Sequence, residues 1–282
     1  MAVAQVAADA KPTREPERGQ EDAVSETSVV AEFRWIEAGR GLPVLCLHGL
    51  FGTSEHFEAT VEALASRSRA MALTLPIFET PPDDLSVVSL RAHVEAFMDA
   101  ERVPPAVVVG NSLGGHVALD LALHAPERVR ALVLSGSSGL FERSFTRNVP
   151  HRPSAEFVRE KMTEVFHDPS MVTPEWVEAI RDRMSRRSYA MRVLQISRSA
   201  RRYNLEDRLG EIRCPTLLVW GMEDRVTPQD VAIRFLDGIP SATLRLVPEC
   251  GHAPMIEHPA AFARAVEEFV DSLTTPEPVG VS

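Results

Sequence analysis

Residues 107–119 read VVVGNSLGGHVAL, in which an apolar run passes through a Gly-x-Ser-x-Gly turn into a helical pattern. This order is typical of a nucleophile elbow, where a serine occupies a sharp, strained bend between a strand and a helix. Gly110 and Gly114 leave room where the strand and the helix cross. The hydroxyl of Ser112 would project above a sheet at a helix N-terminus, which favours developing negative charge. We therefore predict that Ser112 is a nucleophile.

Two other interpretations of this turn compete with the elbow. It could be a glycine-rich turn with an incidental serine, or a turn that binds a dinucleotide. The dinucleotide fingerprint is G-x-G-x-x-G, and Ser112 stands where its second glycine must admit a pyrophosphate. We therefore favour the elbow.

Short apolar runs alternate with amphipathic stretches along most of the chain. We predict strands at Val44–Leu47, Ala70–Leu75, Ala106–Val109, Val129–Leu134, Thr216–Trp220 and Ala242–Val247. We predict helices at Ser54–Ser66, Ser86–Glu101, Leu113–Ala125, Pro228–Leu236 and Pro259–Leu273. Strands this apolar are usually covered on both faces, and their alternation with helices favours a parallel sheet. The predicted fold class is α/β, with a doubly wound, mostly parallel sheet.

One region interrupts this alternation. Between about residues 140 and 208 we predict no strand but three helices, at Ser154–Phe166, Pro174–Ser185 and Ser188–Tyr203. A helical insertion between two strands would lie over the carboxyl ends of the sheet, where ligands bind. We therefore predict a cap over 140–208 and a core of 29–139 and 209–273. Residues 1–28 and 274–282 are poor in large apolar side chains, and we predict flexible tails there.

Charge and composition exclude several classes of function. The chain has 282 residues and a net charge of −10, so it lacks the basic surface that wholesale nucleic-acid binding needs. No run approaches the ~18 apolar residues of a membrane span. Cys46, Cys214 and Cys250 form neither a disulfide framework nor a metal motif, which favours a reducing cytoplasm. We expect a small-molecule substrate, and the sequence carries no signal of oligomeric state.

The charge of the predicted cap differs from that of the whole chain. Residues 140–208 hold 14 Lys or Arg against 10 Asp or Glu. A solvated face explains this basic bias. Alternatively, one or two of the arginines face the pocket and hold an anionic group of the substrate.

A serine is a poor nucleophile unless a base activates it. Among nine histidines, His252 is the best candidate, because Cys250-Gly-His-Ala-Pro254 follows a predicted strand and precedes the last helix. The acid should follow an earlier strand. Asp224 lies just past the strand that ends at Trp220, in a loop that leads to a proline. Glu223, one residue away, is the competing candidate.

Acyl transfer also needs two N–H donors for the oxyanion. One should be the backbone N–H of Leu113, the residue after the nucleophile. The other should come from the His48-Gly-Leu-Phe-Gly52 loop, which follows the first core strand. We predict Leu50 for this donor, with Phe51 as the alternative.

Four motifs, in this order, resemble the α/β-hydrolase superfamily over about residues 29–273. They are the His48-Gly49 loop, the Gly110–Gly115 elbow, the Trp220–Pro228 acid loop and the Gly251–Pro259 histidine loop. The sequence is most similar to the capped branch that contains esterases, C–C hydrolases and haloperoxidases. The resemblance implies a triad of nucleophile, histidine and acid, and it supports aspartate over glutamate as the acid. We expect no cofactor and no metal.

Departures from the family pattern bear on the substrate. The loop Leu75–Asp84 replaces a stretch that most capped relatives share, and it shapes one wall of the pocket. Ala253 stands where ring-cleavage C–C hydrolases resemble one another in a tryptophan. The cap of those enzymes also offers an arginine to a substrate carboxylate, a role that Arg186 or Arg187 would fill here.

We predict a serine hydrolase that cleaves a carboxylic ester or a related acyl bond through an acyl-enzyme. The side chains of Phe51, Phe78, Leu140 and Phe141 should line its pocket under the cap. An alternative keeps the triad and cleaves a carbon–carbon bond in a vinylogous diketo acid. A third interpretation is a binding module in which the triad holds a ligand without turnover.

Overall fold

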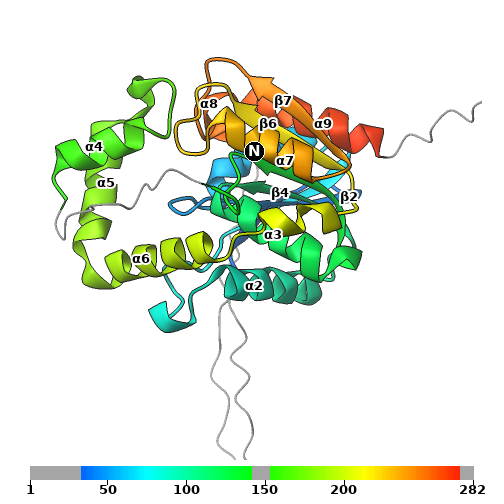
Figure 1. Cartoon of the computed structure of the whole chain (residues 1–282), viewed down its shortest axis with the longest axis horizontal. Coiled ribbons are helices and arrows are strands. Elements are labelled where there is room, and N and C mark those ends of the chain that lie inside the picture. The colour runs from blue at the N-terminus through cyan, green and yellow to red at the C-terminus, as the bar shows by residue number, and fades with distance from the viewer. Residues whose placement is uncertain (1–32, 142–152, 274–282) are drawn as a thin grey trace, which may run out of the picture. The chain divides into compact units, whose positions relative to one another are not determined.

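The computed structural model describes residues 33–141 and 153–273 (Figure 1). Within these residues, seven strands form one sheet in the order β1-β3-β2-β4-β5-β6-β7. The strands are β1 Trp35–Ala38, β2 Leu42–Leu47, β3 Ser68–Leu73, β4 Ala106–Asn111, β5 Val129–Ser135, β6 Thr216–Gly221 and β7 Ala242–Val247. All neighbours pair in parallel except β1, which pairs antiparallel with β3. The predicted fold class, α/β with a mostly parallel sheet, is confirmed.

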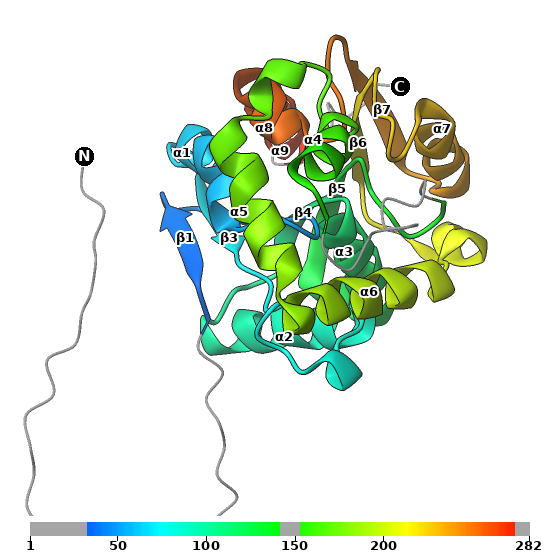
Figure 2. The same ribbon diagram turned by 90° about the vertical axis from the view of Figure 1, so that its left-hand side faces the viewer.

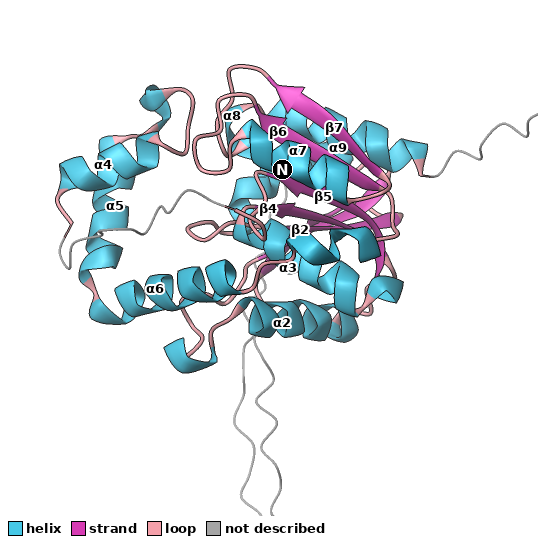
Figure 3. Cartoon of the chain, in the orientation of Figure 1, coloured by secondary structure: helices cyan, strands magenta, loops and turns pink. Residues whose placement is uncertain are grey.

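Helices cover both faces of this sheet (Figure 3). One face carries α2 (Val87–Ala100), α3 (Leu113–His124) and α7 (Gln229–Gly238), and the other carries α1 (Glu58–Leu64) and α9 (Pro259–Ser272). Strand β4 shows why a layer of helices is needed on each face of the sheet. Val108 packs with the first group of helices, whereas Val107 and Val109 pack with the second. Because successive side chains of a strand point to opposite faces, an all-apolar strand requires two layers of helices.

Among the described residues, three α-helices lie between β5 and β6 in the chain, and we call them the cap helices. They are α4 (Ala155–Thr163), α5 (Pro174–Ser185) and α6 (Arg187–Arg202). Side-chain oxygens cap the first two, since Ser154 accepts from the N–H of Phe157 and Thr173 from that of Trp176. Figure 2 shows α5 and α6 in front of the sheet.

Hydrogen bonds join the cap helices and their flanking residues to the core. In α6, the hydroxyl of Ser199 accepts from the N–H of Val87, and Nε of Arg192 donates to the carbonyl of Thr80. Where the chain returns to the core, the N–H of Leu205 donates to the carbonyl of Gly139 at 2.8 Å. After α4, the carbonyl of Val165 accepts from the N–H of His252 at 2.7 Å. The N–H of His167 donates to the carboxylate of Glu257, also at 2.7 Å.

The domain boundaries remain a prediction. The predicted tails, 1–28 and 274–282, lie outside the described residues, as does segment 142–152 of the predicted cap. None of the helices in the described ranges has the length and apolar character of a membrane span.

Candidate active site

Ser112 occupies a strained backbone conformation between β4 and α3. Its φ of 53° and ψ of −118° lie in a region that residues with a side chain rarely adopt. The neighbouring glycines make this bend possible. A Cβ at Gly114 would lie 2.1 Å from the carbonyl oxygen of Leu47, and one at Gly110 would lie 2.5 Å from that of Gly114. The sharp turn expected from the Gly-x-Ser-x-Gly pattern is therefore present.

The imidazole of His252 is held by a buried carboxylate. Its Nδ1 lies 2.9 Å from Oδ2 of Asp224, which comes from the loop after β6. Oδ1 of Asp224 accepts from the N–H groups of Val226 and Thr227, and Oδ2 also accepts from the hydroxyl of Thr227. These bonds fix the carboxylate. Because the carboxylate accepts the Nδ1 proton, Nε2 is left unprotonated and able to act as a base.

Glu223, the competing acid, has a different partner. Its Oε2 accepts from the backbone N–H of Cys250 at 2.9 Å, and its own N–H donates to the carbonyl of Cys250. These two bonds join the acid loop to the histidine loop. The structure thus brings Asp224, and not Glu223, to the imidazole.

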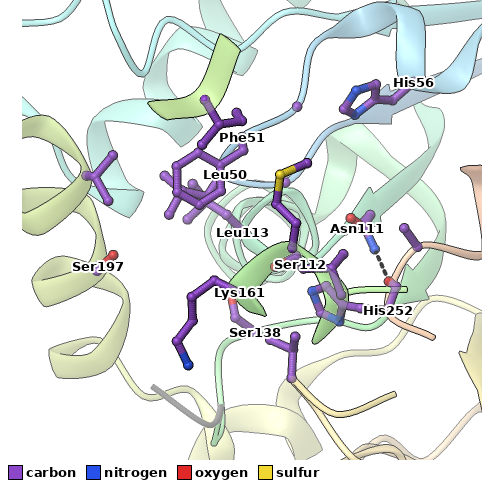
Figure 4. A pocket seen from close by; sticks show the side chains of 18 of the residues that line it. Leu50, Phe51, His56, Asn111, Ser112, Leu113, Ser138, Lys161, Ser197 and His252 are labelled. Carbon is purple, nitrogen blue, oxygen red and sulfur yellow. Dashed lines mark hydrogen bonds between the residues drawn. The ribbon is translucent and has the colours of Figure 1, made fainter. Parts of the chain in front are cut away.

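Ser112 and His252 line the same cavity beneath the cap helices (Figure 4). Asn111 stabilises this arrangement, since its Nδ2 donates to the carbonyls of His252, at 2.9 Å, and of Ser135. A Cβ at Gly136 would lie 2.8 Å from Nδ1 of His252, so the ring packs directly against backbone. The Gly-x-Ser-x-Gly pattern leaves position 111 open, and the support that Asn111 gives to the histidine loop emerges from the fold.

The predicted oxyanion donors also border this cavity. The N–H of Leu113 is the first of α3, and the first four N–H groups of a helix have no partner within it. A Cβ on Gly49 would lie 3.2 Å from the Cβ of Ser112, so the loop after β2 passes directly beside the serine. Leu50 and Phe51 both line the cavity.

His48 fixes the loop that carries Leu50. Its Nδ1 donates to the carbonyl of Gly49 at 2.7 Å, and its Nε2 accepts from the N–H of Leu75 at 2.9 Å. Burial lowers the pKa of His48 to about 4. The ring is therefore neutral at pH 7 and can make both bonds at once.

Most of the apolar wall of the cavity comes from the cap helices. Its residues include Val158, Met162, Trp176, Ile180, Met184 and Ile196. Of the four predicted lining residues, Phe51 is among those at the cavity, whereas the structure places the other three elsewhere. The ring of Phe78 stacks on Tyr189 at 3.9 Å, Leu140 packs against the core of α2 and α3, and Phe141 is half exposed. Leu140 and Phe141 stand at the start of the insertion and Phe78 lies in the loop between β3 and α2, whereas the helices inside the insertion form the wall.

Among the described residues, the cations that line the cavity differ from the two arginines predicted for this role. Arg186 and Arg187 are exposed and lie outside the lining, because they sit at the exposed junction of α5 and α6. Lys161 of α4 and Arg201 of α6 line the cavity instead. The ammonium of Lys161 lies 2.6 Å from the carboxylate of Glu164. Within the described ranges, no group of three or more His, Cys, Asp or Glu residues could hold a metal ion.

Comparison with known proteins agrees with this architecture. The sequence profile of the alpha/beta hydrolase family matches residues 44–265. A 2-hydroxy-6-oxo-6-phenylhexa-2,4-dienoate hydrolase of Burkholderia cepacia is 30% identical over 83% of this chain and 89% of its own. Among solved structures, a meta-cleavage product hydrolase of Pseudomonas fluorescens has a TM-score of 0.74, with 26% identity over 85% of this chain and 94% of its own.

A bacterial membrane phospholipase A is a further structural relative. Its TM-score is 0.77, with 25% identity over 86% of this chain and 83% of its own. The similar proteins thus include enzymes that act on different bonds. The family profile covers most of the described residues, and we conclude that the chain belongs to the alpha/beta hydrolase family.

Proposed function

We propose that this hydrolase cleaves the carbon–carbon bond of a vinylogous diketo acid, a 2-hydroxy-6-oxo-dienoate with an apolar substituent on its reacting carbonyl. The relatives named as a dienoate hydrolase and as a meta-cleavage product hydrolase favour this alternative over the ester hydrolase predicted from the sequence. One observation carries the proposal. Ser112 and His252 share a largely apolar cavity with the cationic side chains of Lys161 and Arg201. Such a cavity suits a molecule with a reactive carbonyl, an apolar end and a carboxylate.

In the proposed reaction, the substrate reacts as its diketo tautomer, in which the proton of the 2-hydroxyl has moved to carbon 5. Ser112 attacks the ketone carbonyl at carbon 6 while His252 takes the proton of the serine and Asp224 stabilises the imidazolium that forms. The N–H groups of Leu50 and Leu113 hold the oxyanion. The carbon–carbon bond then breaks, its electron pair passes into the conjugated dienolate, and the dienolate takes the proton from the imidazolium. Water activated by the imidazole hydrolyses the acyl-serine. One water is consumed, and the products are a carboxylic acid and a hydroxydienoic acid.

The carboxylate of the substrate provides the test. A hydrogen bond to a charged group contributes about 1.5–3 kcal/mol, which corresponds to roughly 10- to 150-fold in affinity. The double variant K161Q/R201Q should therefore raise KM for a diketo acid by about that factor and leave kcat/KM for a neutral aryl ester nearly unchanged. The control is R186Q/R187Q, which removes the same charge outside the cavity. Equal losses on both substrates, or none on the acid, would contradict the proposal.

Hydrolysis of a carboxylic ester is the second candidate. The side chain that lines the cavity after His252 is the small Ala253, and Lys161 already has Glu164 as a partner. Both features leave room for an uncharged acyl group, and the structural relative named as a phospholipase A is consistent with ester chemistry. Steady-state rates on diketo acids, short and long acyl esters and lactones separate the candidates, with Ser112→Ala as the blank. A higher kcat/KM for neutral esters than for any diketo acid would favour this second function.

A further inference from the structure

One face of α6 combines arginines with exposed apolar side chains. The helix holds five arginines and no acid. At about 100° per residue, one face collects Arg187, Met191, Leu194, Arg198, Arg201 and Arg202. Met191 is 45% exposed and Leu194 37%, while the opposite face buries Tyr189 and Ile196. We call these six residues the arginine face; Arg201 lies at its edge, where it also lines the cavity.

The described residues around the arginine face supply it with no ion pair. No acid occurs between positions 183 and 205. Within the described part of the chain, no ion pair joins any arginine of this face to a carboxylate, whereas Arg181 pairs with Glu178 and Arg208 with Glu211. Asp83 and Asp84 on the neighbouring turn of residues 82–84 form no such pair either. The face therefore presents a concentrated positive charge on a protein whose net charge is −10.

We propose that the arginine face docks the protein on an anionic phospholipid surface. Arginines that surround a small apolar patch match a bilayer with acidic head groups, since the cations meet the head groups and the apolar side chains enter the acyl boundary. A second copy of this chain is a poor occupant, because a two-fold contact would bring the same arginines against one another. An acidic protein would match the charge alone.

Docking through the arginine face would also place the cavity close to the lipid. The inner side of α6 contributes Val193, Ile196 and Ala200 to the cavity wall. The helix that would rest on lipid therefore also forms the wall of the pocket, and Figure 2 shows it at the front of the molecule together with α5. Docking would bring the pocket to the layer in which apolar substrates concentrate. The inference does not depend on which bond the enzyme cleaves.

The experiment is sedimentation of the full chain with phosphatidylcholine vesicles that either contain or lack phosphatidylserine. We expect binding to the anionic vesicles only, and weaker binding as salt screens the charges. Each arginine near such a surface strengthens binding by about fivefold, so R187Q/R198Q/R202Q should weaken it on the order of a hundredfold. Arg201 is left unchanged because it lines the cavity.

The matched control removes three exposed arginines of the core, as R40Q/R213Q/R264Q. It should bind vesicles as the unaltered protein does, and thermal unfolding should show that both triple variants fold. M191S/L194S should weaken binding at all salt concentrations. The proposal fails if the unaltered protein does not sediment with anionic vesicles, or if the control loses as much binding as the α6 variant. It also fails if the arginine face binds polyglutamate and not vesicles, which would assign it to an acidic protein.

Discussion

Replacing Asp224 by asparagine tests the proposed role of the acid without emptying its site. The amide oxygen can still accept from the N–H groups of Val226 and Thr227, as Oδ1 does now. The NH₂ group then takes the place of Oδ2 and faces Nδ1 of His252, 2.9 Å away. Because NH₂ donates, Nδ1 must accept and the ring proton moves to Nε2. The nitrogen that should take the proton of Ser112 is then already protonated.

The expected effect falls on kcat. A wrong tautomer at a triad of this kind lowers kcat on the order of 10⁴-fold, or about 5.5 kcal/mol. KM should change little, because Asp224 is outside the cavity lining. Stability should fall by less, about 1–3 kcal/mol, since the hydrogen bonds to the charged carboxylate are replaced by bonds to a neutral amide of the same shape.

The assay is steady-state kinetics on the best substrate of the panel, with urea unfolding as the check on folding. Glu223→Gln is the control, because it makes the same change of charge one residue away, where the carboxylate accepts from the N–H of Cys250. The control should retain nearly full kcat. A loss in Asp224→Asn below about tenfold, or 1.4 kcal/mol, would refute the tautomer argument.

Three further predictions concern stability. Gly114→Ala should lower the free energy of urea unfolding by about 3 kcal/mol, because its Cβ would meet two backbone carbonyls, whereas Gly210→Ala, with nothing within 4 Å of its Cβ, should be nearly neutral. Burial lowers the pKa of His116 to about 4. The contribution of this neutral histidine to the free energy of unfolding is therefore complete above the unfolded pKa near 6.5, and it declines as the pH falls towards 4. His116→Leu should therefore shrink the difference in unfolding free energy between pH 7.5 and pH 5 by about 2 kcal/mol. Glu257→Ala should lower the free energy of unfolding by about 2–4 kcal/mol, because it leaves the N–H groups of Gly251 and His167 without an acceptor. Glu257→Gln should recover part of this loss.

Each of these has a clear contrary result. Equal stabilities of the two glycine variants would show that α3 can move away from β2 at no cost. An unchanged pH difference in His116→Leu would mean that this histidine takes up its proton in the folded state. An unchanged free energy of unfolding in Glu257→Ala would mean that water replaces the carboxylate at both N–H groups.

The sequence predicted well the features that depend on local order. Each predicted strand is present, and α5 runs from Pro174 to Ser185 as expected, because Thr173 caps its start and the pattern of buried residues is regular. The edge strand β1 escaped prediction because its residues are only half buried. The motif residues Asp224 and His252 meet because strands of one parallel sheet end at the same edge.

The predictions that failed all depended on contacts across the insertion. Phe78 was expected in the pocket, yet it stacks on Tyr189, a residue more than a hundred positions later in the chain. Which cations of α4 to α6 face inward depends on how those helices rotate against one another. Arg186 and Lys161 cannot be told apart by composition, and only the fold places Lys161 at the cavity.

The hydrogen bond between the carbonyl of Val165 and the N–H of His252 links the segment after α4 to the loop that carries the proposed base. If α4 swings outward to admit a reactant, that bond must break, and the backbone of the proposed base loses an anchor. An open molecule would then hold a loosened imidazole, and a shut one a tightened imidazole. The enzyme would then react only while it is closed and solvent is excluded. A substrate that is only partly bound would leave without reacting.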